Sequence, residues 1–186
     1  MRWTPEAVAT ITAGTLVRSG GGPIAGAFFD SRKPIVGGLF VPIVAARDGH
    51  DFLDAAIDAG ASAVLTGPGR SLPKEGASVI EVADPERAFA TLARHARQQC
   101  TGPVIAITGS NGKTTTRALI EAVVASGYKQ VLCTQGNFNN HLGVPLTILG
   151  EPHQPDAMVL EFGMSAPGEN RHLAQIAEPT VSVITS

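Results

Sequence analysis

The sequence predicts an α/β protein made of two successive α/β units. Short apolar or β-branched runs alternate with stretches whose apolar residues recur at helical spacing, first over residues 20–98 and then from Val104 onwards. Gln98–Pro103, between the two series, has the composition of a linker. We therefore expect a small N-terminal domain over residues 1–99 and a second domain, with a parallel sheet, over residues 103–186.

A short, capped helix precedes the first series. Thr4, Pro5 and Glu6 supply a cap, a proline at the first helical position and an acid in the first turn. The glycines at 20–22 predict a flexible turn, and a dinucleotide fingerprint is excluded because we expect no strand before them and no helix after them. Further strands are predicted at Ile24–Phe29, Leu39–Ile43, Ala63–Thr66 and Val79–Val82, with helices beginning near Phe52 and Asp84.

The second series predicts one helix over Lys113–Ser126 and strands at Val104–Thr108, Val131–Thr134, Ala157–Glu161 and Val181–Ile184. A parallel sheet of about four strands that stops without a closing helix is typical of an N-terminal piece of a longer protein. The unfinished edge of such a sheet would favour self-association.

Composition excludes several classes of protein. The chain is 44% hydrophobic and 16% charged, and its net charge is −2 without any block of like charges, which argues against a nucleic-acid surface and a polybasic membrane anchor. No run is long and apolar enough for a membrane span, and the N-terminus lacks the pattern of a signal peptide. Cys100 and Cys133 have no metal-binding spacing, so we expect a reducing, cytoplasmic location.

One stretch indicates a specific chemistry. Gly109, Ser110, Asn111 and Gly112 lie between a buried strand and a helix, where the first backbone N–H groups and the helix dipole favour an anion. Lys113 would supply a cation for the outer phosphates of a nucleotide, and the hydroxyl of the next residue would reach Mg²⁺. The residues expected to bind a nucleotide are Gly109, Ser110, Asn111, Gly112, Lys113, Thr114 and Thr115.

The spacing is two residues shorter than that of a standard P-loop. A G-x-x-G-K-[ST] pattern arises by chance in under ~1% of chains of this length. The alternative is a glycine turn followed by a solvated lysine and a threonine-rich first helical turn.

Two further segments are expected at the same edge of the sheet. If strands 104–108 and 157–162 are parallel neighbours, Glu161 lies near the glycine loop and can hold Mg²⁺, although it could instead cap a helix. The loop with Asn137, Asn139 and Asn140 follows the next strand, and its amides could bind a substrate or only form turns.

Four stretches together resemble the Mur ligases, the amide-forming enzymes of peptidoglycan precursor synthesis. TGSNGKTTT, TQGNFNNHLGVPLTIL and VLEFGMSAPGE resemble their central ATPase domain, and FDSRKPIVGGLFVPIVAARDGHDFLDAAIDAGASAVL resembles their N-terminal UDP-binding domain. The asparagine pair followed by GVPLT resembles the MurF type. The resemblance implies a small UDP-binding-like α/β domain followed by a truncated P-loop, parallel-sheet ATPase domain.

The resemblance also implies roles for individual residues. Lys113 and Glu161 would be catalytic, Thr114 and Glu161 would hold Mg²⁺, and the family's modified lysine and C-terminal domain would lie beyond Ser186. The substrates would be UDP-N-acetylmuramoyl-tripeptide and D-alanyl-D-alanine, with ATP as the energy source. The residues implied to bind the muramyl substrate are Ser31, Arg32, Asp48, Gly49, His50, Asn137, Asn139 and Asn140.

The implied chemistry is amide formation through an acyl phosphate, and it needs no protein nucleophile. Three alternatives stay open: another ligase of the superfamily, of the MurE or folylpolyglutamate synthase type; a P-loop ATPase or small-molecule kinase; and a nucleotide-binding fragment without turnover. No nucleic-acid or membrane partner is expected, and the full-length protein is expected to be a monomer.

Overall fold

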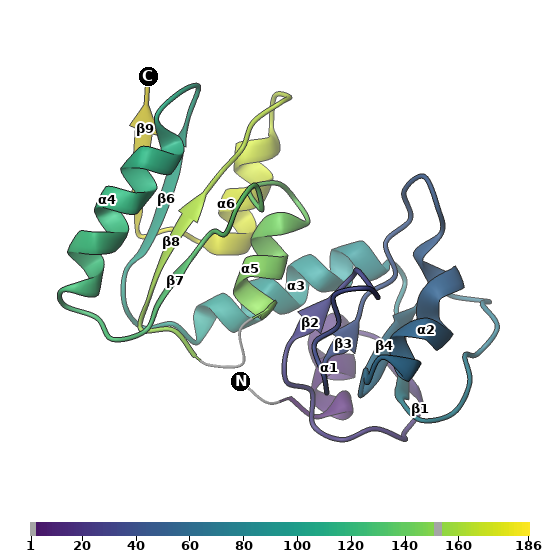
Figure 1. The fold of residues 1–186 in the computed structure, drawn as a ribbon. Coiled ribbons are helices and arrows are strands. Elements are labelled where there is room, and N and C mark those ends of the chain that lie inside the picture. Colours follow the sequence, from purple (N-terminus) through teal and green to yellow (C-terminus); the bar gives the residue numbers. More distant parts are fainter. Residues whose placement is uncertain (1–2, 151–153) are drawn as a thin grey trace. The chain divides into compact units, whose positions relative to one another are not determined.

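The computed structural model describes residues 3–150 and 154–186. The chain divides into two compact units, Met1–Leu92 with Leu149–Pro152, and Ala93–Ile148 with His153–Ser186. The division falls inside helix α3 (Pro85–Gln98), a few residues before the expected linker. Both units are mixed α/β structures with parallel strand pairs, as the alternation of patterns predicted (Figure 1).

The first unit contains a five-stranded sheet in the order β1-β5-β4-β3-β2. Neighbouring strands from β2 to β5 are parallel, and β1 pairs antiparallel with β5 at one edge. The strands are β1 (Thr15–Arg18), β2 (Ala27–Phe28), β3 (Leu39–Phe40), β4 (Ala63–Thr66) and β5 (Ser78–Glu81).

Strand β1 corrects one expectation. We expected no strand before the glycines at 20–22, but Thr15–Arg18 forms the antiparallel edge strand. Its residues alternate between exposed and half-buried, so this segment lacks the apolar run by which the other strands were recognised. The dinucleotide fingerprint stays excluded, because the segment after these glycines leads into β2 and not into a helix.

Strands β2 and β3 are shorter than the apolar runs that predicted them. Ile24, the first residue of the predicted strand Ile24–Phe29, forms an antiparallel bridge with Trp3 and does not pair with β3. In the second run Val41 still donates its N–H to Phe28, but Pro42 has no N–H to continue the ladder.

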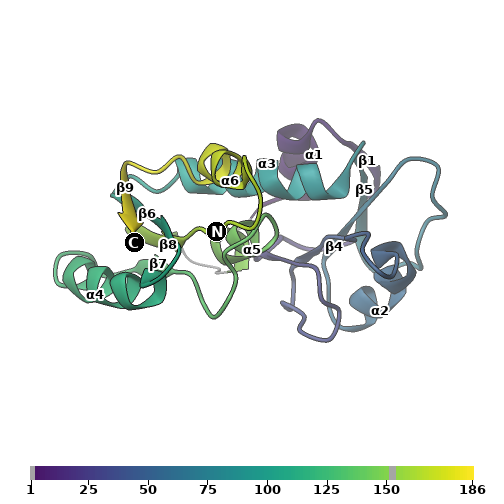
Figure 2. The same cartoon turned by 90° about the horizontal axis from the view of Figure 1, so that it is seen from above.

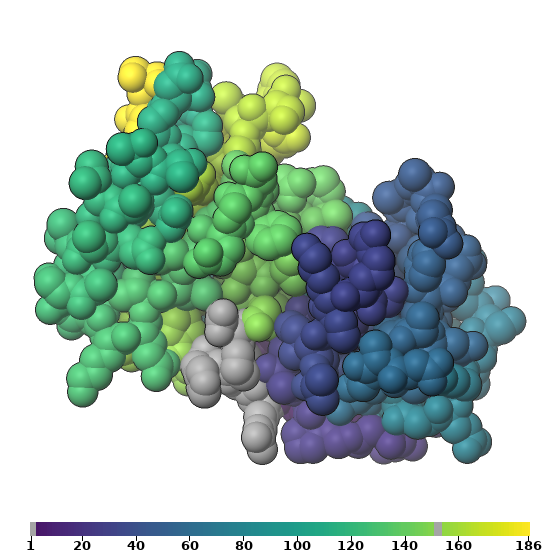
Figure 3. Space-filling model, in the orientation of Figure 1, coloured from purple at the N-terminus to yellow at the C-terminus, as the bar shows by residue number. Residues whose placement is uncertain are grey.

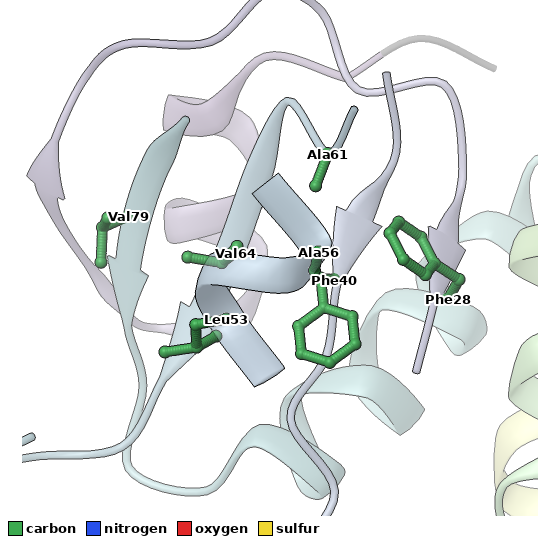
Figure 4. Packing of buried hydrophobic residues seen from close by; sticks show 7 residues of the cluster. All are labelled: Phe28, Phe40, Leu53, Ala56, Ala61, Val64 and Val79. Carbon is green, nitrogen blue, oxygen red and sulfur yellow. The ribbon is translucent and has the colours of Figure 1, made fainter. Parts of the chain in front are cut away.

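Helices α1 (Pro5–Thr12) and α2 (Leu53–Asp58) lie on opposite faces of this sheet (Figure 2). The predicted cap of α1 is confirmed, since the Thr4 hydroxyl accepts from the N–H of Ala7 at 3.2 Å. Helix α2 follows a 3₁₀ turn, η1 (Gly49–Phe52), and its buried side chains pack on the sheet (Figure 4). The buried hydrophobic cluster formed by α2 and the sheet consists of Phe28, Phe40, Leu53, Ala56, Ala61, Val64 and Val79.

The second unit contains a four-stranded, all-parallel sheet in the order β7-β8-β6-β9, which confirms the predicted parallel sheet of about four strands. Its strands are β6 (Val104–Gly109), β7 (Val131–Cys133), β8 (Ala157–Glu161) and β9 (Val181–Thr185). Helix α4 (Lys113–Ala125) covers one face of the sheet and α6 (Glu169–Ala177) the other (Figure 2).

Two helices, α5 (Gly143–Gly150) and α6, had no counterpart among the predicted elements. Helix α5 has the sequence GVPLTILG, which is apolar almost throughout and therefore shows no contrast between a polar and an apolar face. Helix α6 begins two residues after Pro167, and its N-cap is Gly168 with a positive φ of 94°. Among the described residues, no helix is both long and apolar enough to cross a membrane.

Candidate functional site

The glycine loop connects the carboxyl end of β6 to the first turn of α4, as the sequence predicted. Gly109 has a φ of 136°, and a Cβ there would lie 2.2 Å from the carbonyl oxygen of Thr185. Gly112, with a φ of 78°, is the N-cap of α4 and has no side chain to accept the first helical N–H groups. Both glycines are therefore required by backbone geometry, and the start of α4 stays open to an anion.

The end of β9 is hydrogen-bonded to the glycine loop. The N–H of Asn111 donates to the carbonyl of Ser186 at 2.9 Å. The Thr185 hydroxyl donates to the carbonyl of Asn111 and also lies 3.2 Å from that of Thr108. In the space-filling view the yellow end of the chain lies at the surface beside the teal segment that carries the loop (Figure 3). The loop conformation is thus fixed by a strand more than seventy residues away in sequence.

Lys113 lies back across the loop. Its Nζ donates to the carbonyl oxygen of Gly109 at 2.7 Å and lies 3.4 Å from that of Ser110. The first intrahelical hydrogen bond of α4 runs from the N–H of Thr116 to Gly112, so the N–H groups of the three preceding residues have no acceptor within the helix. A cation and free backbone donors therefore lie together beside exposed residues Ser110, Asn111, Thr114 and Thr115.

Glu161 lies next to the first turn of α4. Strands β6 and β8 are parallel neighbours, with Ile107 opposite Glu161. The Thr114 hydroxyl donates to Oε2 of Glu161 at 3.3 Å, and the backbone N–H of Glu161 donates to the Thr134 hydroxyl at 2.9 Å. Glu161 is only 2% exposed. The predicted proximity of Glu161 to the loop is confirmed, and its side chain does not cap a helix end in this arrangement.

This donor set fits a magnesium ion bound together with a nucleotide. A carboxylate and a hydroxyl are hard oxygen ligands, and a nucleotide-bound Mg²⁺ takes its remaining ligands from phosphates and water. In the described ranges, no three His, Cys, Asp or Glu side chains gather into a cage for a metal. A site with one carboxylate agrees with the way in which Mg²⁺ is bound alongside phosphates, and not with an all-protein cage.

The thiol of Cys133 is buried and is not suited to act as a nucleophile. Cys133, at the end of β7, is 4% exposed. Burial and, next, the negative charge of Glu121 raise the pKa of the Cys133 thiol to about 12, so the thiol stays protonated near neutral pH.

The asparagine loop follows β7 at the same edge of the sheet. Oδ1 of Asn140 accepts from the N–H groups of Leu142 and Gly143, at 3.2 and 2.8 Å, and so caps the start of α5. The carbonyl of Asn139 accepts from the N–H of Gly163, which joins this loop to the segment after β8. Asn137 is exposed. Asn140 thus has the turn-forming role weighed from the sequence, and substrate binding by the three asparagines stays a prediction.

In the first unit, the residues implied to bind the muramyl substrate follow β2 and β3. Because these strands are parallel neighbours, Ser31 and Arg32 lie at the same sheet edge as the Asp48–His50 segment. Arg32 is 87% exposed, and its Nε and a terminal nitrogen pair with the two carboxylate oxygens of Asp30 at 2.8 and 2.9 Å. The Arg32 guanidinium holds the pKa of the Asp30 carboxyl below its usual range.

Asp48 and His50 form a small network that binds two loops together. Oδ1 of Asp48 accepts from the backbone N–H of His50 at 3.0 Å and from its Nδ1 at 2.7 Å, and Arg70 pairs with Oδ2 at 2.8 Å. The N–H of Gly67 donates to Nε2 of His50 at 3.1 Å. Nε2 therefore accepts, and the ring proton resides on Nδ1. Hydrogen bonds from the backbone and ring of His50 lower the pKa of Asp48 to about 2.

Gly49 is also fixed by its surroundings. A Cβ at this position would lie 2.5 Å from the nitrogen of Ile43, and the Gly49 N–H donates to the Ile43 carbonyl at 3.0 Å. The Asp48–His50 segment thus holds together the loops at the carboxyl edge of the first sheet. Direct contact between these residues and a ligand stays a prediction.

Several contributors to the site were not predicted from the sequence. Arg117 pairs with Glu161 at 2.9 Å and with Glu121 at 2.7 Å. Asn170 on α6 donates from Nδ2 to the Thr108 hydroxyl at 2.9 Å, just before the glycine loop. The i,i+4 spacing of Arg117 and Glu121 was the one available signal, and it is equally typical of a solvent-exposed helix face.

Comparison with known proteins identifies the second unit. Residues 107–186 match the Mur ligase middle domain. The UDP-N-acetylmuramoyl-tripeptide–D-alanyl-D-alanine ligase of Bacillus subtilis is 44% identical over 164 residues, which are 88% of this chain and 36% of that protein. The ligase of the same name from Escherichia coli is 37% identical over 158 residues, 84% of this chain and 34% of that protein.

Solved structures agree with these relatives. MurF from Acinetobacter baumannii aligns with 99% of this chain and 40% of its own length, at a TM-score of 0.87 and 29% identity. A MurF ligase from Thermotoga maritima in complex with ADP covers 86% of this chain at a TM-score of 0.74 and 32% identity. This chain spans between a third and two fifths of the length of the relatives named here. With the glycine loop and Glu161 placed as described, the chain belongs to the Mur ligase family.

Proposed function

We propose that this chain is an N-terminal part of an ATP-dependent amide ligase that joins D-alanyl-D-alanine to UDP-N-acetylmuramoyl-tripeptide. The relatives named above carry this activity in their names, and the chain spans only part of their length. The activity is therefore proposed for the complete enzyme. The chain by itself is expected to bind nucleotide without turning it over.

One observation carries the proposal: the buried carboxylate of Glu161 lies 3.3 Å from the Thr114 hydroxyl, beside Lys113 and the free N–H groups of the first turn of α4. A nucleotide phosphate at the start of α4 would lie between a cation, backbone donors and a metal-binding carboxylate. Mg²⁺ held by Thr114 and Glu161 would offset phosphate charge when bound.

The reaction follows from the properties of its substrates. A carboxylate is a poor acylating agent because its oxygen is a poor leaving group. An oxygen of the tripeptide carboxylate would attack the γ-phosphorus of ATP, the bond from that phosphorus to the bridging oxygen would break, and ADP would leave. The amine of D-alanyl-D-alanine would then add to the acyl phosphate, lose a proton and expel phosphate, which leaves the amide.

In this scheme the loop N–H groups orient the phosphates, and Lys113 stabilises negative charge that develops during transfer. Lys113 would exchange its contact with the Gly109 carbonyl for a phosphate oxygen, since both are acceptors within reach of a flexible side chain. The loop is already shaped by β9, so little reorganisation is required.

We assign the first unit to the UDP-muramyl substrate. The support is the common sheet edge shared by Ser31, Arg32 and the Asp48–His50 segment, together with the likeness of the whole chain to MurF structures. A cytoplasmic location is proposed as well, in agreement with two free, buried cysteines.

The test labels the tripeptide carboxylate with ¹⁸O in the complete enzyme and measures the label in released phosphate. One labelled oxygen per phosphate, released only when D-alanyl-D-alanine is present, is the expected result. Phosphate without label and without dependence on the amine would favour a simple ATPase. Label transfer with a different preferred amine would instead favour a MurE-type or folylpolyglutamate-type ligase.

A further inference from the structure

Arg117 lies on α4 three residues after Thr114, outside the glycine loop. Its Nε donates to Oε1 of Glu161 at 2.9 Å, and a terminal nitrogen donates to Oε2 of Glu121 at 2.7 Å. The side chains of Arg117 and Glu161 are 17% and 3% exposed. This ion pair is therefore largely shielded from solvent, unlike a typical surface pair.

The two oxygens of Glu161 have different surroundings. Oε1 is occupied by Arg117, whereas Oε2 faces the Thr114 hydroxyl. The Thr134 hydroxyl fixes the backbone of Glu161 through its N–H. The carboxylate is thus held from two directions, and only one of its oxygens is available on the side of the glycine loop.

We propose that Arg117 is a positioning residue that restricts Glu161 to one metal-binding oxygen and so favours Mg²⁺ over Ca²⁺ at the nucleotide site. This inference rests on the proposed function, in which Thr114 and Glu161 hold magnesium. Mg²⁺ needs near-octahedral geometry and is bound through single carboxylate oxygens, whereas Ca²⁺ takes about six to eight oxygens and often uses both oxygens of a carboxylate. Occupation of Oε1 removes a ligand that Ca²⁺ would use and Mg²⁺ does not need.

An arginine is suited to this role. Its planar guanidinium binds two carboxylates at fixed angles, so Glu121 anchors the group while Nε holds Glu161. The positive charge also compensates a buried carboxylate that would otherwise be unpaired before a metal binds. Loss of Arg117 would free Oε1 and let the Glu161 side chain rotate.

The test measures ADP binding to the 186-residue chain by calorimetry, in Mg²⁺ and separately in Ca²⁺. We expect Arg117→Met to lower the ratio of the Mg²⁺-supported to the Ca²⁺-supported affinity by at least about tenfold, the scale of losses when an outer partner of a metal ligand is removed. Arg171→Met, the same change at an exposed position on α6, is the control and should keep the parental ratio. A ratio for Arg117→Met within about twofold of the parent overturns the inference.

Two further variants separate this inference from the proposed function. Thr114→Val and Glu161→Gln should each remove the gain in ADP affinity that Mg²⁺ provides. If neither does, the metal site is wrong and both statements fall. If both do while Arg117→Met keeps the parental ratio, only the role of Arg117 falls. Should circular dichroism show that Arg117→Met is unfolded, Arg117→Gln replaces it, with the same expected fall and the same contradicting result.

Discussion

At the scale of single residues, the site depends on a carboxylate that is almost fully removed from solvent. Glu161 is 2% exposed, yet its carboxylate and backbone have three side-chain partners: Thr134, which directly follows β7, and Thr114 and Arg117 on α4. Thr114 and Lys113 could be predicted because they are contiguous in the loop pattern. The ion pair with Arg117 could not be predicted, because it depends on how α4 packs against β8, and no local sequence pattern contains that information.

The Asp48 network gives a prediction about pH. The folded pKa of Asp48 is about 2, below the ordinary value of 3.8, so the carboxylate contributes stability above that ordinary value. This contribution is lost as pH falls from about 4 towards the folded pKa. We therefore expect the parent to be more stable than Asp48→Asn near pH 5, with the difference in unfolding midpoint shrinking towards pH 2.

The measurement is denaturant unfolding at a series of pH values. Asp51→Asn, an exposed position in the same turn, serves as the control and should follow the parent throughout. A difference in unfolding midpoint between the parent and Asp48→Asn that stays constant from pH 5 to pH 2 would contradict the lowered pKa of Asp48.

At the scale of elements, the loop between β6 and α4 is shaped by a close approach. An alanine at Gly109 would need a φ of 136° and would place its Cβ 2.2 Å from the Thr185 carbonyl oxygen. Gly109→Ala should therefore cost at least about 2 kcal/mol of unfolding free energy, from backbone strain and overpacking together. Gly136→Ala is the matched control, because Gly136 has a φ of 53° but no atom near its Cβ.

Denaturant unfolding followed by circular dichroism compares the two variants, and Gly136→Ala should lose only about 1 kcal/mol. Equal losses in the two variants would show that the approach of β9 does not constrain the loop.

The edge of the second sheet gives another prediction. Strand β9 is the last strand of the order β7-β8-β6-β9, and Val181 and Ile184 on it are 49% and 81% exposed. An unpaired, apolar edge favours association of copies of the chain. The average mass in light scattering should rise with protein concentration for the parent and much less for Ile184→Lys.

Val36→Lys controls for added charge, because Val36 is 78% exposed and belongs to the first unit, so it is not part of the second sheet. It should associate like the parent. A parent that stays monomeric at all concentrations would contradict the role of β9.

Elements were predictable where they carry a local signal. Strands β4, β8 and β6 are buried apolar runs, and α1 has a complete cap, so their positions followed from the sequence. Strand β1 lies half-exposed at an edge, and α5 is apolar almost all round, so neither shows the periodicity on which such predictions depend.

At the scale of the whole molecule, the two units use the same principle. In each, polar residues that follow parallel strands come together at the carboxyl edge of a sheet, although they are far apart in sequence. The order of the strands, and not the spacing of the residues, brings Glu161 to the glycine loop. This is why the candidate site could be predicted only on the condition that β6 and β8 are neighbours, which the structure confirms.

The proposed function requires that the loop between β6 and α4 binds the phosphates of ATP through Lys113. Calorimetry of Mg·ATP binding to the 186-residue chain tests it most directly, with the parent and Lys113→Ala compared in the same buffer. We predict that Lys113→Ala weakens binding by about tenfold to a hundredfold, roughly 1.5–3 kcal/mol, the scale of a lost hydrogen bond to a charged group. Parental binding that needs no Mg²⁺, or Lys113→Ala binding within a few-fold of the parent, would show that Lys113 and the metal do not hold the phosphates.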